Sequence, residues 1–164
     1  MNFVLLSWMF ALVVTIHNIE EAIFLPKWSR TAGRWHYPVG DREFRFAVAV
    51  ITVLTYVAAY FATSGGKGSI GAYIISGYAL AMLLNVLFPH LIATLAMRRY
   101  APGTATALLF NLPITSLLLY QSFHQGYVEK SVYLYIGPSV AVGIVLLIPV
   151  LFAVGRRLFE HKKS

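Results

Sequence analysis

The chain has 164 residues, of which 59% are hydrophobic and only 12% charged, against roughly 25% charged in an ordinary globular chain. With a mean hydropathy of +0.71, this composition excludes an ordinary soluble domain and indicates an integral membrane protein. The formal net charge of +7 does not indicate nucleic-acid binding, because the basic residues fall in short segments between apolar runs. The chain has no cysteine, which excludes disulfides, iron–sulfur clusters, thiolate metal sites and cysteine nucleophiles.

Five segments are long and apolar enough to be transmembrane helices, which need about 20 mostly apolar residues. In chain order they are residues 2–25, 44–63, 69–97, 103–123 and 131–158. The first has no basic leader and no small-residue cleavage pattern, so we expect a mature helix and not a signal peptide. Pro26 is expected to end it. The sequence thus predicts an all-α integral membrane protein, a five-helix bundle forming a single transmembrane domain over residues 1–164.

The distribution of basic residues predicts the orientation of this bundle. One side carries only Lys67 and Lys130. The other side carries the remaining eleven, which are Lys27, Arg30, Arg34, Arg42, Arg45, Arg98, Arg99, Arg156, Arg157, Lys162 and Lys163. Because cytoplasmic loops are enriched in Lys and Arg, we expect the N-terminus outside and the C-terminus in the cytoplasm of a cell (inner) membrane crossed several times.

Ionisable residues inside an apolar span cost about 2.5–3.5 kcal/mol each at mid-helix, so they are functional candidates. The first span carries the run His17-Asn18-Ile19-Glu20-Glu21. On a helix, His17, Glu20 and Glu21 stand at i, i+3 and i+4 and share one face. The third span carries Asn85 and His90, and the fourth carries Asn111.

These polar residues fall at a similar depth. At a rise of about 1.5 Å per residue, those of all three spans lie in the cytoplasmic third of the bilayer. Pro89 and Pro113 add backbone carbonyls that lose their helical partners, those of Asn85 and Leu109. We therefore expect one shared polar pocket that opens toward the cytoplasm.

Two adjacent carboxylates in such a pocket need a compensating charge. The candidates are a histidinium, an arginine such as Arg98 or Arg45, and a bound metal. His17, Glu20, Glu21 and His90 offer a nitrogen–oxygen ligand set that suits zinc, iron or manganese. No motif for an organic cofactor is present. A structural alternative is that the same residues form a polar clamp between helices.

The run from His17 to Glu21 resembles the signature of the HXXEE domain family, small multi-spanning and mainly bacterial membrane proteins. The resemblance covers nearly the whole chain in length and span pattern, although only these five residues match as a motif. It implies importance for His17, Glu20 and Glu21, and His90 matches a later histidine of the family. It implies no particular reaction.

The function predicted from the sequence is that of a membrane enzyme acting on a lipid-like or isoprenoid-like substrate. Its expected catalytic residues are His17, Glu20, Glu21, His90, Asn85 and Asn111. A metal could polarise a substrate oxygen or activate water. A metal-free acid–base isomerase or cyclase needs only a protonated Glu and a neutral His, and a small proton-linked carrier would use the same residue types.

The expected partners are membrane lipids or a lipophilic small molecule. The fifth span also contains Gly137, Gly143 and Gly155. Small residues of this kind favour close helix packing or a homodimer.

Overall fold

Five helical stretches are long and apolar enough to cross a membrane, and none of the described residues forms a strand. The computed structural model describes residues 1–160; Lys162 and Lys163 of the predicted basic tail lie outside them. The first two stretches are α1 (Phe3–Ser29) and α2 (Asp41–Gly65), joined through a short 3-10 turn, η1 (Gly33–Trp35). The predicted fold, an all-helical chain with five long apolar helices, is confirmed to this extent.

The third and fourth stretches are interrupted helices. The third consists of α3 (Ile70–Asn85), a π-helical turn η2 (Val86–Leu91) and α4 (Ile92–Met97). The fourth consists of α5 (Thr104–Thr106), a second π-helical turn η3 (Ala107–Asn111) and α6 (Leu112–His124). The fifth stretch is α7 (Lys130–Glu160), a single helix that contains Pro138 and Pro149.

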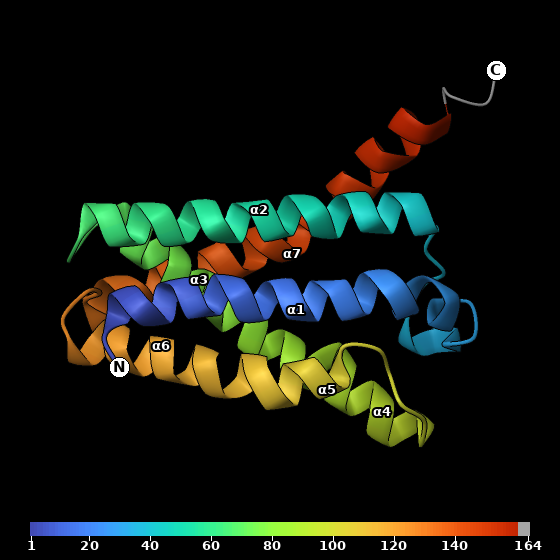
Figure 1. Ribbon diagram of the computed structural model, residues 1–164, viewed down its shortest axis with the longest axis horizontal. Helices are drawn as coiled ribbons and strands as arrows, with labels where there is room; N and C mark the ends of the chain where they lie inside the picture. The colour runs from blue at the N-terminus through green and yellow to red at the C-terminus, as the bar shows by residue number, and fades with distance from the viewer. Residues whose placement is uncertain (161–164) are drawn as a thin grey trace.

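The helices run alternately up and down, and α3 occupies a central place. It packs against α2, α6 and α7, while α1 packs against α2 and α6. The N-terminus, the α2–α3 turn and the α6–α7 turn lie at one end of the bundle (Figure 1). The α1–α2 connection, the α4–α5 connection and the last turns of α7 lie at the other end (Figure 1). This second end carries the basic loops.

Glycine allows the close contacts that α3 makes. A Cβ added to Gly71 would lie 2.4 Å from the backbone of Phe61 in α2, and one added to Gly77 would lie 2.6 Å from Val140 of α7. In α7 itself, Gly155 approaches Glu43 of α2, whereas Gly143 has open space where a side chain would stand. Gly155 therefore serves packing within the chain.

The prediction that Pro26 ends the first helix is wrong. The helix continues through Pro26 to Ser29. A proline inside a helix leaves the carbonyl four residues earlier without its N–H partner, and here that carbonyl belongs to Ala22. The Nε of Arg45 donates to the Ala22 oxygen at 3.2 Å. An arginine from α2 thus replaces the missing donor, which a reading of the first segment alone could not reveal.

Candidate metal centre

Helix α1 brings His17 and Glu21 to the same place, one turn apart, near the basic end of the bundle. The side chain of His17 is fully buried and that of Glu21 is 14% exposed. Residues at i and i+4 lie above one another on a helix face, and the polar run therefore presents both groups toward the third helical stretch.

The interruption of the third stretch supplies the next residue. Phe88 has extended backbone angles (φ −130°, ψ 124°) just before Pro89, so the helix is broken there and resumes in α4. This agrees with the predicted effect of Pro89 on the helix. His90 directly follows the break and its side chain is 1% exposed. Irregular backbone of this kind is common where a π-turn builds a functional site.

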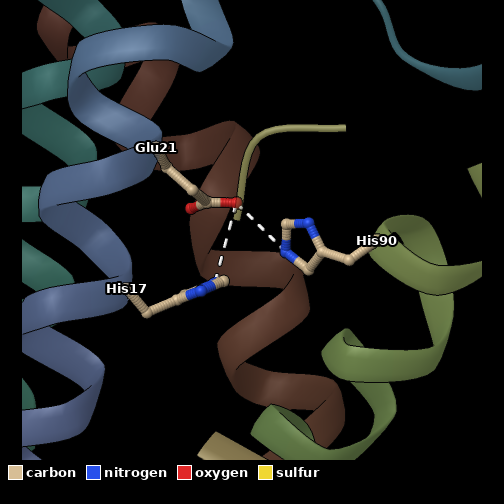
Figure 2. Close-up of side chains that lie close together, drawn as sticks. All are labelled: His17, Glu21 and His90. Atoms are coloured by element: carbon tan, nitrogen blue, oxygen red, sulfur yellow. Dashed lines mark ion pairs between the residues drawn. The ribbon is translucent and has the colours of Figure 1, made fainter. Parts of the chain in front are cut away.

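His17, Glu21 and His90 converge on one point. Figure 2 shows both imidazoles directed at the same Glu21 carboxylate oxygen: the Nε2 of His90 lies 3.2 Å and the Nε2 of His17 3.8 Å from Oε1. One ligand atom from each residue lies within 4.8 Å of the other two. Three ligands around a tetrahedral zinc ion stand about 3.4 Å apart, given metal–ligand distances near 2.1 Å. The observed separations are thus close to those of a bound-metal geometry.

Asn85, the last residue of α3, joins the two histidines. Its Nδ2 lies 3.2 Å from the Nε2 of His17 and 3.0 Å from the Nε2 of His90. An amide nitrogen only donates, so in this orientation both imidazole nitrogens act as acceptors. The same Nε2 of His90 lies 3.2 Å from Oε1 of Glu21, a second acceptor, and two acceptor atoms this close require a proton or a cation between them.

Glu20 turns away from this cluster toward the α4–α5 connection. Its Oε1 accepts hydrogen bonds from the backbone N–H of Gly103 at 2.9 Å and from the hydroxyl of Tyr100. Its Oε2 accepts from the hydroxyl of Thr106 at 2.6 Å and from the backbone N–H of Thr106 at 3.3 Å. The carboxylate thus satisfies N–H groups at the start of the fourth helical stretch, which have no partner within a helix. The negative charge of Glu20 is stabilised by these donors and not by Arg98 or Arg45, the arginines considered above.

Tyr100 lies outside the helical spans and remains a hydrogen-bond donor. Partial burial, and then the donation of its hydroxyl to Glu20, raise the pKa of Tyr100 above its ordinary value. The phenol therefore stays protonated at neutral pH and continues to donate to Glu20.

Thr106 connects the Glu20 carboxylate to His17. The Nδ1 of His17 lies 3.0 Å from the Thr106 hydroxyl oxygen. Because that hydroxyl donates its hydrogen to Glu20, it accepts from His17 Nδ1–H. The relay fixes His17 as the tautomer with a bare Nε2, which faces the cluster. A carboxylate that orients a ligand histidine through its second nitrogen is typical of metal sites.

Gly103 closes the cluster from the α4–α5 connection. Its φ is +91°, and a Cβ there would lie 2.5 Å from Cε1 of His90 and 2.9 Å from Cε1 of His17. No larger residue fits this position without moving an imidazole. The sequence showed only a turn here, and neither Gly103 nor Thr106 could be identified as part of a site.

A cavity of about 220 Å³, the central cavity, lies beside the cluster. Glu21 and Asn85 form part of its wall together with Asn18, whose Nδ2 donates to Thr52 at 2.8 Å. The rest of its wall is mainly apolar and includes Leu25, Phe44, Val48, Tyr78, Met82, Ile144 and Phe152. His36, a loop histidine for which no role in a site was predicted, also lines it.

Asn111 is the predicted site residue that makes no described hydrogen bond to the cluster. It ends η3 and its side chain is fully buried, but neither its Nδ2 nor its Oδ1 has a hydrogen-bond partner among the described residues. The structure therefore brings together His17, Glu21, His90 and Asn85, holds Glu20 next to them, and shows no hydrogen bond from Asn111 to any of them.

Comparison with known proteins agrees with the motif at the centre of this site. The family described as "Protein of unknown function with HXXEE motif" matches residues 8–118, which include all of these side chains. The chain belongs to the HXXEE family. It is also 42% identical over 151 residues to a Bacillus subtilis (strain 168) protein described as "Uncharacterized protein YrkK", covering 91% of this chain and 94% of that protein. No solved structure matches the chain.

Proposed function

We propose that this HXXEE protein is a multi-pass membrane enzyme that uses a metal ion held by His17, Glu21 and His90 to act on a lipophilic substrate. The N-terminus lies outside and the basic end of the bundle faces the cytoplasm, as the eleven-to-two distribution of Lys and Arg favours. The chemistry then takes place inside the bundle, near the cytoplasmic surface of the inner membrane.

The observation that carries the proposal is the convergence of two imidazole nitrogens and one carboxylate oxygen beside the central cavity. Two His and one carboxylate form the ligand set of catalytic zinc sites and of non-haem iron oxygenases, which leave coordination positions open for water or substrate. A structural zinc site would instead be closed by four protein ligands. The amide of Asn85, turned to present Oδ1, offers a weak fourth ligand that substrate could displace.

The bound ion would polarise a substrate oxygen or activate a water molecule. The protein's own residues orient that chemistry. Glu20 and Thr106 hold the His17 ring, Gly103 keeps the approach to both imidazoles narrow, and the apolar wall of the central cavity excludes bulk water. Each electrostatic interaction in such a site is stronger than it would be in water.

The metal is tested by elemental analysis of the detergent-purified protein after loading with Zn²⁺, Fe²⁺ or Mn²⁺ and removal of the free ion. We expect about one equivalent in the wild type, since the cluster can hold one ion. His17→Ala, His90→Ala and Glu21→Gln should lose it, whereas His124→Ala, at the opposite end of the bundle, should keep it. Failure of all three metals to bind the wild type would contradict the metal centre.

Catalysis is tested separately, with the protein in vesicles of total bacterial lipid. We expect mass spectrometry to show lipid species that appear or disappear with the wild type, and not with Glu21→Gln or after chelation. A lipid change that survives chelation would instead support the metal-free acid–base enzyme, for which the contact of 3.2 Å between His90 and Glu21 is the favouring observation. No change with any loaded metal would contradict the enzyme proposal.

A further inference from the structure

The central cavity shares wall residues with larger cavities toward both ends of the bundle. Ligand pockets usually measure about 300–1,000 Å³, so a cavity of 220 Å³ is too small by itself for most ligands. Three larger cavities share residues with it. Two of them lie toward the two ends of the bundle and have walls of sharply different chemistry; the third is a side groove of about 470 Å³ that shares Ala81, Asn85 and Val145.

The cavity toward the basic end is called here the head pocket. It measures about 530 Å³ and shares His36, Pro89, Ile148 and Phe152 with the central cavity. Its wall carries two arginines from different parts of the chain, Arg34 of η1 and Arg156 of α7. Neither makes an ion pair with any of the described side chains of residues 1–159. The acidic residue in the same wall, Glu43, already accepts the Gly40 N–H at 3.0 Å.

The cavity toward the other end is called the tail groove. It measures about 620 Å³, lies between α2, α3 and α7, and shares Ile51, Tyr78 and Ile144 with the central cavity. Its wall is apolar along most of its length and includes Leu54, Val57, Phe61, Ile74, Val140 and Leu147. It extends as far as Gly65 and Ser69, at the end of the bundle away from the arginines.

The head pocket, the central cavity and the tail groove, taken in this order, fit an elongated amphiphilic ligand. One end offers two cationic side chains without a described ionic partner, the middle offers Glu21 and Asn85, and the far end offers apolar walls only. Guanidinium groups bind phosphate and carboxylate oxygens through several parallel hydrogen bonds. The charge and the apolar length are thus arranged as in an anionic lipid with one chain.

We infer that the substrate is a single-chain lipid with an anionic headgroup, bound with its head between Arg34 and Arg156, its chain in the tail groove and the junction of head and chain beside Glu21. This inference rests on the proposed function, because it assigns the substrate class of the same site. It places the reacting bond close to the headgroup and not near the end of the chain.

The test measures binding of radiolabelled oleoyl lysophosphatidate to the purified full-length protein in uncharged detergent. Arg34→Gln and Arg156→Gln should each weaken binding about tenfold, which corresponds to the loss of one charge-assisted contact. Arg157→Gln is the matched control, because Arg157 is exposed on the same turn and lines neither cavity. Oleoyl lysophosphatidylcholine, with the same chain but no net charge, should compete at least tenfold less well.

The tail groove has its own pair of variants. Leu147→Trp fills the tail groove and should weaken lysophosphatidate binding, whereas Leu146→Trp should not, because Leu146 lines the side groove beside Leu84 and Leu87 and is absent from the walls of the central cavity, the head pocket and the tail groove. Equal binding of the zwitterionic lipid, equal effects of Arg156→Gln and Arg157→Gln, or a larger effect of Leu146→Trp would overturn the inference.

Metal content measured on the same samples separates the two proposals. Metal without lysophosphatidate binding contradicts the inference and leaves the metal centre intact. Lysophosphatidate binding without metal supports the lipid site and contradicts the metal-dependent function. Unchanged metal content in all five arginine and leucine variants shows that the fold of the site is retained.

Discussion

At one end of the bundle the turns of residues 66–69 and 125–129 bind each other and the starts of neighbouring helices, such as the Phe3 N–H that donates to Gln125 at 3.2 Å. At the other end the connection of residues 98–103 binds the motif itself. At the first end, the N–H of Gly68 donates to the carbonyl of Tyr127 at 2.9 Å, and the N–H of Glu129 donates to the hydroxyl of Tyr73 at 3.0 Å. At the second end, the Gly103 N–H donates to the Glu20 carboxylate of α1, 83 residues away in sequence.

The two ends differ in their relation to the site: the turns of the first end only connect helices, whereas the 98–103 connection forms part of the site. The turns of the first end close hairpins between helices and contact no group of the His–Glu cluster. The 98–103 connection, in contrast, places Gly103 against both imidazoles. The same motif carboxylate that holds this connection also fixes the His17 tautomer through Thr106. Glu20 therefore supports the cluster, while Glu21 belongs to it.

The largest effect is expected from Gly103→Ala. An alanine at φ +91° costs about 1–2 kcal/mol in backbone strain, and the contact with His90 adds about 1–3 kcal/mol of overpacking. We expect a loss of about 2–5 kcal/mol in the free energy of unfolding, together with loss of the bound metal, measured by thermal unfolding in detergent and by elemental analysis.

Gly126→Ala is the matched control from the opposite end of the bundle. Gly126 also has a positive φ, +69°, but a Cβ there meets nothing within 4 Å. It should cost only the backbone term, about 1–2 kcal/mol, and retain the metal. Equal losses in the two variants, with metal bound in both, would show that the approach of Gly103 to the histidines has no importance.

A smaller effect is expected from Glu20→Gln. The neutral amide keeps one acceptor oxygen but loses the charge that the four donors stabilise. Residues that orient metal ligands typically change metal affinity by about 10–100-fold, and we expect a loss in this range, measured by competition with a chromophoric chelator. Complete loss of metal, as large as that in Glu21→Gln, would indicate that Glu20 is itself a ligand.

Two variants of Thr106 distinguish the loss of His17 orientation from general damage to the loop. Thr106→Val removes the hydroxyl at nearly constant shape and should weaken metal binding about tenfold. Thr106→Ser keeps the hydroxyl and should restore wild-type affinity. If Ser and Val weaken binding equally, the relay from Glu20 through Thr106 to His17 does not operate.

The sequence predicted the five helical stretches because each one is a long apolar run, a property that needs no knowledge of tertiary contacts. It also selected His17, Glu21, His90 and Asn85, since polar groups inside such runs are rare. The same rule selected Asn111, which makes no described hydrogen bond to the cluster, because depth along a helix does not specify the partners of a side chain.

The residues that the sequence did not reveal act through contacts between distant segments. Gly103 and Thr106 look like an ordinary turn and helix start, and their roles depend on their distance from α1. Glu20 was assigned to the same ligand set as Glu21, because adjacent residues of a motif look equivalent until their partners are known. The end of α1 was misplaced for a similar reason, since Arg45 belongs to the following helix.

The smallest effect is expected at this last contact, and it tests whether the basic end also holds α1 together. Arg45→Met leaves the Ala22 carbonyl, freed by Pro26, without its donor, and should cost about 1 kcal/mol in the free energy of unfolding. In a Pro26→Ala background the substituted residue has a backbone N–H that can donate to the Ala22 carbonyl as in any helix, so Arg45→Met should then cost almost nothing.

Thermal unfolding of the wild type, the two single variants and the double variant gives the coupling energy directly. Equal costs of Arg45→Met in both backgrounds would show that the arginine stabilises the α1–α2 connection in some other way, and that the helix tolerates Pro26 without it.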